Sequence, residues 1–178
     1  MMPKLLLILK HLWLDRSDAE RAIPPEVLAR VTQRVTASEK RHSGEIRICV
    51  EAALPLSYLW RINRAKPLQQ VIRERALALF GKLGVWDTEH NNGVLIYVLL
   101  AEHAIEIVAD RGLNIHASDK HWKAVMARMS STFRELRYED GLTQALEETS
   151  ALLMQHFALP PSDTAANPNE LPDAPLLL

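Results

Sequence analysis

The sequence predicts an α/β domain with a mixed sheet and helices on both of its faces. Residues Glu45–Glu51 alternate between apolar and polar types, as a half-covered strand does, and Val94–Leu100 is apolar at every position, as a central strand is. A short turn separates Val94–Leu100 from a third strand-like run, Ala104–Ala109, so these two runs should form an antiparallel hairpin. Amphipathic helical stretches precede, separate and follow the strands, which favours helices on both faces of the sheet.

Four longer helices are expected from apolar residues at helical spacing. Pro24 and Pro25 fit the first turn of the first helix, and Ser118 is a suitable N-cap for the third. Residues 55–67 should form a loop or a mobile excursion that exposes Trp60. The expected helices cover residues 24–40, 67–84, 118–133 and 139–157.

Length and charge fit a single domain without a nucleic-acid partner. The chain has 178 residues and a formal net charge of -1, so no global basic field attracts nucleic acid. We interpret a local basic cluster as a solvated linker and helix face. The only cysteine, Cys49, excludes an internal disulfide and fits a small buried side chain. The clustered basic residues are Arg61, Arg64, Lys66, Arg73 and Arg75.

The two ends of the chain differ from the domain between them. The apolar run Leu5–Leu9 is too short for a signal peptide or an integral membrane segment. Residues 1–19 are expected to form an amphipathic lead-in with the stripe Leu5, Ile8, Leu9 and Leu12. Docking on the core or on a partner is favoured for this lead-in over a membrane-surface role. Residues 20–158 form the predicted domain, and 159–178 an extended or disordered Pro-rich tail.

Two polar segments should meet at one end of the hairpin. Asp87–Gly93 leads into its first strand, and Asp110–Asn114 follows its second. In an antiparallel pair, the start of one strand lies beside the end of the other. We call these two segments together the hairpin rim. The helix that begins near Ser118 should bring Asp119 to the same place.

The hairpin rim is rich in side-chain oxygen atoms, which hard cations prefer as ligands. Its spacing is not that of an EF-hand, so a cation site is inferred only from convergence. In the alternative interpretation, Asp87 and Asn92 cap loops, Gly93 permits a turn and Asp110 pairs with Arg111. Spacing alone favours this structural alternative. The oxygen-bearing residues are Asp87, Glu89, Asn91, Asn92, Asp110 and Asp119.

Other chemistries lack a supporting motif. The spacing of His90, His116 and His121 does not suit a tetrahedral zinc site. The sequence has no Gly-x-Ser-x-Gly elbow for a serine nucleophile. It also has neither a Gly-x-Gly-x-x-Gly turn after a strand nor a Walker-type lysine loop, so we expect no organic cofactor.

The same segments resemble the TPM domain family, named after thylakoid-lumen, photosystem II-associated and nematode receptor-accessory proteins. Ser43–Arg47, Asn91–Ile96, Ile105–Ile107 and Asp110–Gly112 carry the resemblance, together with Asp87, and it covers roughly residues 20–158. It implies a three-layer α/β/α sandwich with a mixed sheet containing a central antiparallel hairpin. The chain is similar to short bacterial members without a signal peptide or membrane helix. This similarity implies a cytoplasmic protein, or one peripheral to the inner membrane.

The resemblance also implies a function for the hairpin rim. Some family members bind divalent cations there, which makes Asp87, Asn91, Asn92 and Asp110 the candidate ligands of Ca²⁺ or Mg²⁺. Proximity adds Glu89 and Asp119 to this set. The resemblance brings the cation interpretation level with the structural one.

Two functions are then expected, from different classes. The first is a binding or accessory module of the TPM type that acts with a membrane-associated protein partner. The alternative is a metal-assisted acid phosphatase, the activity attributed to plant lumenal members of the family. In that enzyme, Asp87 or Asp110 would be the nucleophile, and Arg111 would stabilise the developing charge.

Overall fold

A computed structural model describes residues 4–160 and 168–178, with the backbone but not the side chain of Asp119. The strands and the four long helices lie close to their expected positions. The elements follow one another as α1 (Lys4–Leu12), α2 (Arg16–Ala22), α3 (Pro25–Glu39), β1 (Ile46–Glu51), α4 (Leu56–Leu59), α5 (Leu68–Lys82), β2 (Val94–Leu99), the 3-10 helix η1 (Leu100–Glu102), β3 (Ala104–Ala109), α6 (Arg111–Asn114), α7 (Asp119–Arg134), α8 (Tyr138–Phe157) and β4 (Leu176–Leu177).

The sheet has the strand order β3-β2-β1-β4. Strand β1 is parallel to both β2 and β4, whereas β2 and β3 form the antiparallel hairpin. The register pairs Ile48 with Ile96, and Ile96 with Ile107. These pairings confirm the predicted mixed sheet.

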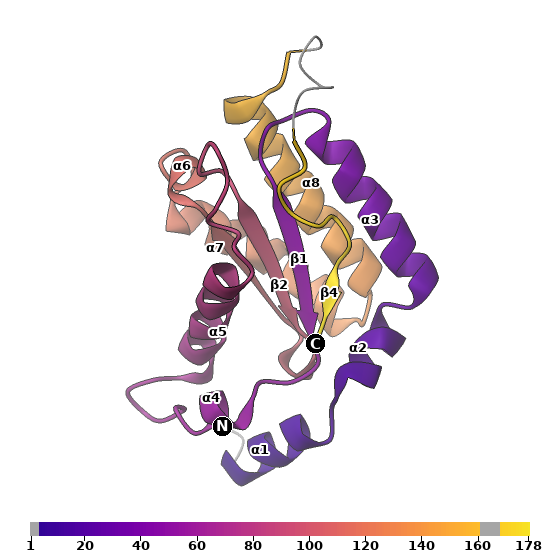
Figure 1. Ribbon diagram of the computed structural model, residues 1–178. Helices are drawn as coiled ribbons and strands as arrows, with labels where there is room; N and C mark the ends of the chain where they lie inside the picture. Colours follow the sequence, from indigo (N-terminus) through magenta and orange to yellow (C-terminus); the bar gives the residue numbers. More distant parts are fainter. Residues whose placement is uncertain (1–3, 161–167) are drawn as a thin grey trace.

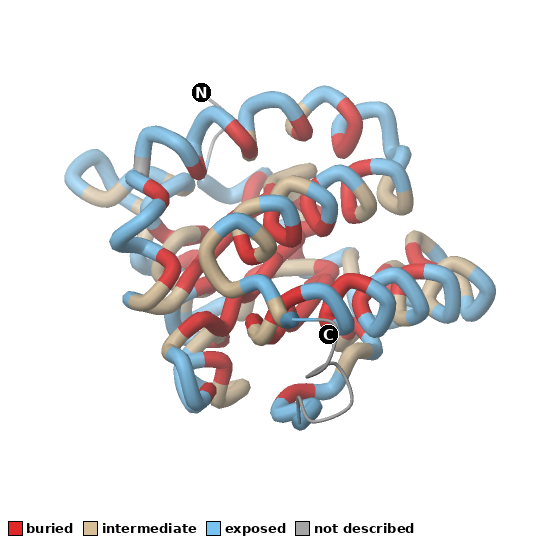
Figure 2. Tube along the Cα trace, turned by 90° about the horizontal axis from the view of Figure 1, so that it is seen from above, coloured by how far each residue is buried: buried red, intermediate tan, exposed pale blue. Residues whose placement is uncertain are grey.

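Helices cover both faces of the sheet, as Figure 1 shows. One face packs against α2, α3, α7 and α8, through alternate strand residues such as Ile48 and Ile96. The other face packs mainly against α5, through residues such as Leu95 and Tyr97. Buried residues therefore gather in the middle of the molecule and exposed ones on the outer sides of the helices (Figure 2). The three-layer α/β/α arrangement is confirmed.

Strand β1 is fully buried, so the prediction of a half-covered strand is wrong. Its polar side chains face partners inside the protein and not solvent. The guanidinium of Arg47 donates to the carbonyl oxygens of Pro172 at 2.7 Å and Ala174 at 2.5 Å. Cys49 lies between Arg47 and Glu51 on this strand, and burial raises the pKa of its thiol to about 12. Such a thiol stays protonated, which supports a structural role for Cys49.

Two arginines of the basic cluster pair with buried carboxylates, so the prediction of a solvated helix face is wrong for Arg75 and holds only in part for Arg73, whose side chain is 37% exposed. Arg75 donates to the Glu51 carboxylate from Nε at 3.0 Å and from Nη2 at 2.5 Å. Arg73 pairs with the buried Glu106 carboxylate at 3.3 Å. Burying these carboxylates requires a cationic partner, and α5 supplies one to each of them.

The C-terminal segment, residues 168–178, lies along the outer edge of β1. Leu176 pairs with Cys49 and Leu177 with Val50, while Leu171 is buried against the α5 side of the sheet. The described part of the predicted tail is therefore extended, and it supplies an edge strand that its composition did not indicate. Residues 161–167 lie outside the described residues.

Helix α1 docks on the domain, but of its predicted apolar stripe only Ile8 takes part, partly buried against the α5 side of the sheet. Leu7 and His11 are buried, whereas Leu5, Leu9 and Leu12 are exposed. The His11 Nδ1 atom accepts a hydrogen bond from the backbone of Leu54 at 3.0 Å, which leaves Nε2 to donate to Glu102 at 3.2 Å. This polar contact determines which face of α1 turns inward. None of the helices described is both long and apolar enough to cross a membrane.

A buried acid near the end of α3 should make stability depend on pH. Burial raises the pKa of Glu39 to about 8, although its carboxylate accepts a hydrogen bond from the Ile46 backbone at 2.9 Å. The ordinary value is 4.5, so the folded protein retains a proton that the unfolded chain releases between these two pH values. Stability contributed by the protonated form is present below pH 4.5 and is lost as pH rises toward 8.

Glu39→Gln, which stays neutral, should remove this loss. The unfolding free energy of the variant minus that of the native chain should rise by about 2 to 3 kcal/mol when the pH is raised from 5 to 7. Urea unfolding at both pH values measures the difference. The exposed Glu26 lies on the same helix and provides a control. If Glu26→Gln shows an equal gain, the stability change does not come from Glu39.

Candidate cation site at the hairpin rim

The two segments of the hairpin rim meet as the hairpin direction predicts. The Asp110 backbone donates to the carbonyl of Gly93 at 2.9 Å, and the Gly112 backbone donates to the carbonyl of Asn91, also at 2.9 Å. Arg111 adds a forked contact to the side-chain oxygen of Asn91, at 3.0 Å from Nε and 2.8 Å from Nη2. The predicted juxtaposition is confirmed.

Two glycines allow the backbones of the rim to touch. A Cβ atom at Gly93 would overlap the carbonyl oxygen of Val85. At Gly112 it would lie 2.5 Å from the carbonyl oxygen of Asn91 and 2.7 Å from that of His90. Both glycines are required by close approach, and several carbonyl oxygens gather at the rim as a result.

Asp110 is the most unusual group of the hairpin rim. Its Oδ1 atom accepts a hydrogen bond from the backbone of Arg111 at 2.7 Å and so caps α6. Its Oδ2 atom is buried and has no hydrogen-bond partner among the described residues. A buried carboxylate oxygen without a partner is costly, and a bound cation is one way to satisfy it.

The side chains of the two adjacent asparagines have different hydrogen-bond partners. Asn91 has a positive φ of 51° and directs its side-chain oxygen to Arg111. Asn92 is fully buried, and its side-chain nitrogen donates to the hydroxyl of Ser43 at 3.1 Å. Its backbone donates to the hydroxyl of Thr88, also at 3.1 Å. Asn92 therefore fastens the rim to the segment before β1.

The remaining candidates do not join this group. Asp87 and Glu89 are exposed, and no hydrogen bond or ion pair of the described residues links their carboxylates to Asp110. The side chain of Asp119 lies outside the described residues. Within residues 4–160 and 168–178, no three His, Cys, Asp or Glu side chains form a metal-binding group. A cation at the rim would therefore need Asn and carbonyl oxygens beside Asp110.

Glu170 also reaches the rim, which sequence reasoning missed. Its two carboxylate oxygens accept from the Glu89 backbone at 3.2 and 3.3 Å. No pattern in the sequence indicates this contact, because Glu170 lies in the Pro-rich C-terminal segment, far along the chain from Glu89. Only the pairing of that segment with β1 brings it here.

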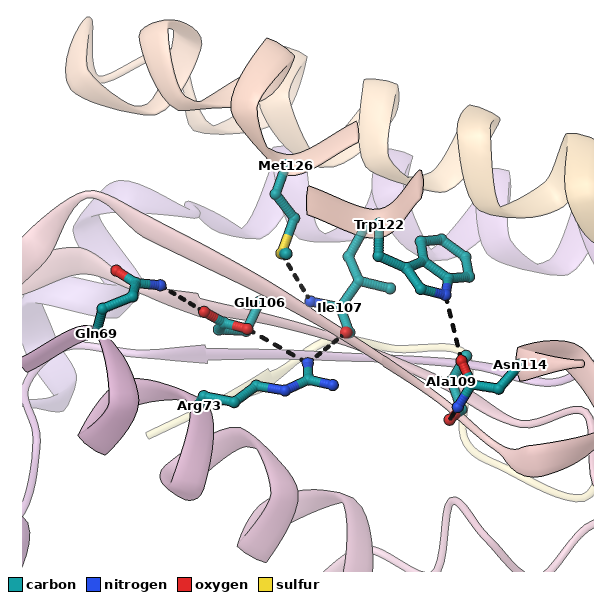
Figure 3. A network of polar contacts seen from close by, with 8 residues as sticks. All are labelled: Gln69, Arg73, Glu106, Ile107, Ala109, Asn114, Trp122 and Met126. Atoms are coloured by element: carbon teal, nitrogen blue, oxygen red, sulfur yellow. Dashed lines mark hydrogen bonds and ion pairs between the residues drawn. The ribbon is translucent and has the colours of Figure 1, made fainter. Parts of the chain in front are cut away.

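Away from the rim, a hollow of about 620 Å³ lies between α5 and α7 beside β3. Figure 3 shows side chains that form hydrogen bonds with backbone groups on the outer edge of this strand. Arg73 donates to the carbonyl of Ile107 at 2.6 Å, and Met126 Sδ accepts from the Ile107 backbone at 3.3 Å. Glu106 is held by Gln69 and Arg73, and burial raises its pKa. These contacts protect an edge strand, which is a structural role.

A buried serine–histidine pair also has a structural role. His42 Nδ1 donates to the carbonyl of Gly44 at 3.0 Å, so Nε2 accepts from the Ser150 hydroxyl at 3.1 Å. Both residues are buried, and burial lowers the pKa of His42 to about 4. The pair joins the start of β1 to α8 and is closed to a substrate.

A family model matches most of the sandwich. The model of the TPM domain matches residues 17–152, which is most of the chain. The chain belongs to the TPM domain family. The match leaves out α1 and the C-terminal segment that carries β4.

A solved structure supports the TPM fold. The BA42 protein from the psychrophilic bacterium Bizionia argentinensis, determined by NMR, is similar with a TM-score of 0.67 and 25% identity. The similarity covers 85% of this chain and 92% of BA42. The comparison with curated proteins gave no match.

Proposed function

We propose that this TPM domain is a binding module that holds a divalent cation, Ca²⁺ or Mg²⁺, at the hairpin rim. The observation that supports it is the buried Asp110 Oδ2 atom, which has no partner among the described residues. In such an accessory module, the cation would order the rim for contact with a membrane-associated protein partner. Oxygen donors at the rim have the chemistry that both cations prefer.

Asp110 and Asn91 would hold the cation. Asn91 presents its side-chain oxygen, which Arg111 occupies in this structure, and its carbonyl lies against Gly112. The guanidinium would have to leave this oxygen for a cation to use it. With one carboxylate and neutral oxygens, the affinity should be weak, with a Kd on the order of 10⁻⁴ to 10⁻³ M.

Calorimetric unfolding with CaCl₂ or MgCl₂ tests the proposal. At a cation concentration ten times Kd, the native chain should gain about 1.4 kcal/mol of stability. Asp110→Asn should lose this gain, since it removes the charge but retains the size of the side chain. The exposed Asp140 on α8 lies outside the rim, and Asp140→Asn should behave like the native chain. A gain that survives Asp110→Asn would contradict the proposal.

The metal-assisted phosphatase is the alternative, because the rim also holds a guanidinium: that of Arg111, bound to the side-chain oxygen of Asn91, while the Arg111 backbone donates to Asp110. Hydrolysis of p-nitrophenyl phosphate with and without Mg²⁺ distinguishes it from the binding module. Metal-dependent hydrolysis lost in Asp110→Asn and retained in Asp140→Asn would establish the enzyme. Cation binding without hydrolysis would support the module.

A further inference from the structure

Exposed apolar side chains gather on α1 and around α4. Among the described residues, eleven large hydrophobic side chains are exposed, and seven of them belong to these two places. Trp13 is 84% exposed and Trp60 67% exposed, values that core residues do not show. We call the seven residues the leucine–tryptophan patch: Leu5, Leu6, Leu9, Leu12, Trp13, Leu56 and Trp60.

Lys4 joins helix α1 to the segment that carries Trp60. The ammonium of Lys4 donates to the carbonyl oxygens of Trp60 at 3.2 Å and Ile62 at 2.9 Å. It also lies 5.4 Å from the centre of the Trp60 ring. Helices α1 and α4 lie at the lower end of the molecule in Figure 1, whereas α6 of the hairpin rim lies at the upper end.

Packing against the domain does not explain the patch. Helix α1 docks through Leu7, Ile8 and His11, so its outward face could be polar without loss of these contacts. A group of large apolar side chains left in water usually marks an interaction surface. Helix α1 also lies outside the residues that match the TPM domain, so the surface is an addition to it.

The charges around the patch indicate the kind of partner. Residues 4–13 and 56–66 contain no Asp or Glu. They hold five basic residues. Lys10 pairs with Glu102, and Arg61 and Lys66 pair with Glu74. Lys4 and Arg64 have no carboxylate partner among the described residues, so they carry the free positive charge of the patch. Leucine and tryptophan beside lysine and arginine are typical of helices that lie in the headgroup region of anionic membranes. The basic residues are Lys4, Lys10, Arg61, Arg64 and Lys66.

We propose that the leucine–tryptophan patch docks on an anionic lipid surface. Helix α1 would lie along the membrane, with Trp13 and Trp60 at the level of the headgroups. At nine residues, or about 14 Å, α1 is far shorter than a hydrocarbon core. The hairpin rim, at the other end of the molecule, would face away from the lipid. This docking does not require the rim to bind a cation.

Vesicle co-sedimentation of the full chain tests the docking. The chain should bind vesicles that contain phosphatidylglycerol more tightly than vesicles of phosphatidylcholine alone, and salt should weaken the binding. Leu12→Ser with Trp13→Ser, and separately Lys4→Glu with Arg64→Glu, should each reduce binding at least about tenfold. Trp86 is 54% exposed near the rim, and Trp86→Ser should bind like the native chain.

Three results would overturn the proposal. One is a native chain that does not bind anionic vesicles, and another is unchanged binding by the Leu12 and Trp13 variant. The third is a dimer in solution that dissociates when Trp13 is replaced, since the patch would then be a protein interface. Circular dichroism should show that all variants fold, because every replaced residue is exposed and only Lys4 loses hydrogen bonds to another segment, those to the carbonyls of Trp60 and Ile62.

Discussion

Gly93→Ala is expected to lower the free energy of unfolding by about 4 kcal/mol or more. The new Cβ atom would overlap the carbonyl oxygen of Val85, a backbone atom that cannot turn away as a side chain can. On its other side, Gly93 accepts a hydrogen bond from Asp110 at 2.9 Å, so moving it would separate the two segments of the rim. Chemical unfolding of the purified variant measures the loss.

Gly81→Ala provides the matched control. Gly81 is in α5, and a Cβ atom there would meet nothing within 4 Å. Alanine has the higher helix propensity, so this variant should be more stable by about 0.5 to 1 kcal/mol. Equal effects of the two replacements would show that the backbone at Gly93 is not in close contact with Val85.

Arg75→Met should cost about 3 to 5 kcal/mol, because it leaves the Glu51 carboxylate buried without its cation. Glu51 also accepts from the hydroxyl of Tyr97 at 2.7 Å, and this bond alone does not neutralise the charge. Methionine keeps the volume of the arginine stem, so the loss reports mainly on charge. Thermal or urea unfolding measures it at neutral pH.

The comparison is with an exposed ion pair. Arg128 and Glu148 are 2.8 Å apart, with side chains 56% and 40% exposed. Arg128→Met should therefore change stability by no more than about 1 kcal/mol. If Arg75→Met were equally mild, the Glu51 carboxylate would be solvated or protonated, and the buried ion pair would not contribute as described.

The sheet and helices could be predicted because local patterns determine them. The apolar run ending at Leu100 has no polar position, which indicates a strand covered on both faces, and β2 is such a strand. Ser118 caps α7 because its side-chain oxygen accepts a hydrogen bond from the His121 backbone, as its residue type suggested. Hairpin direction then placed Asp110 beside Gly93 without any tertiary information.

Contacts between distant segments could not be predicted. The alternation in β1 indicated a solvent-facing side, yet Arg47 is satisfied by carbonyls of the C-terminal segment, more than a hundred residues later. Nor does the sequence show which face of α1 docks, since the contact of His11 with Glu102 depends on the position of η1. Long-range polar pairs leave no periodic signal.

The position of the rim could be predicted from the sequence, but the directions and partners of its side chains could not. Asn91 and Asn92 are adjacent in sequence, yet one is directed to Arg111 and the other into the interior. The positive φ of Asn91 turns the two side chains in different directions. The residue types alone, two asparagines, do not show which one faces inward. Asp87 is an acid of the same segment, but it is exposed to solvent, whereas Asp110 Oδ2 is buried.

Amide NMR spectra recorded during a Ca²⁺ titration test the proposed cation site at the hairpin rim most directly. We expect resonances of Asn91–Gly93 and Asp110–Gly112 to shift together and saturate, while those of α1 do not move. Asp110→Asn should abolish these shifts with the fold intact. Unchanged rim resonances in the native chain, or shifts that persist in Asp110→Asn, would contradict a cation site built on Asp110.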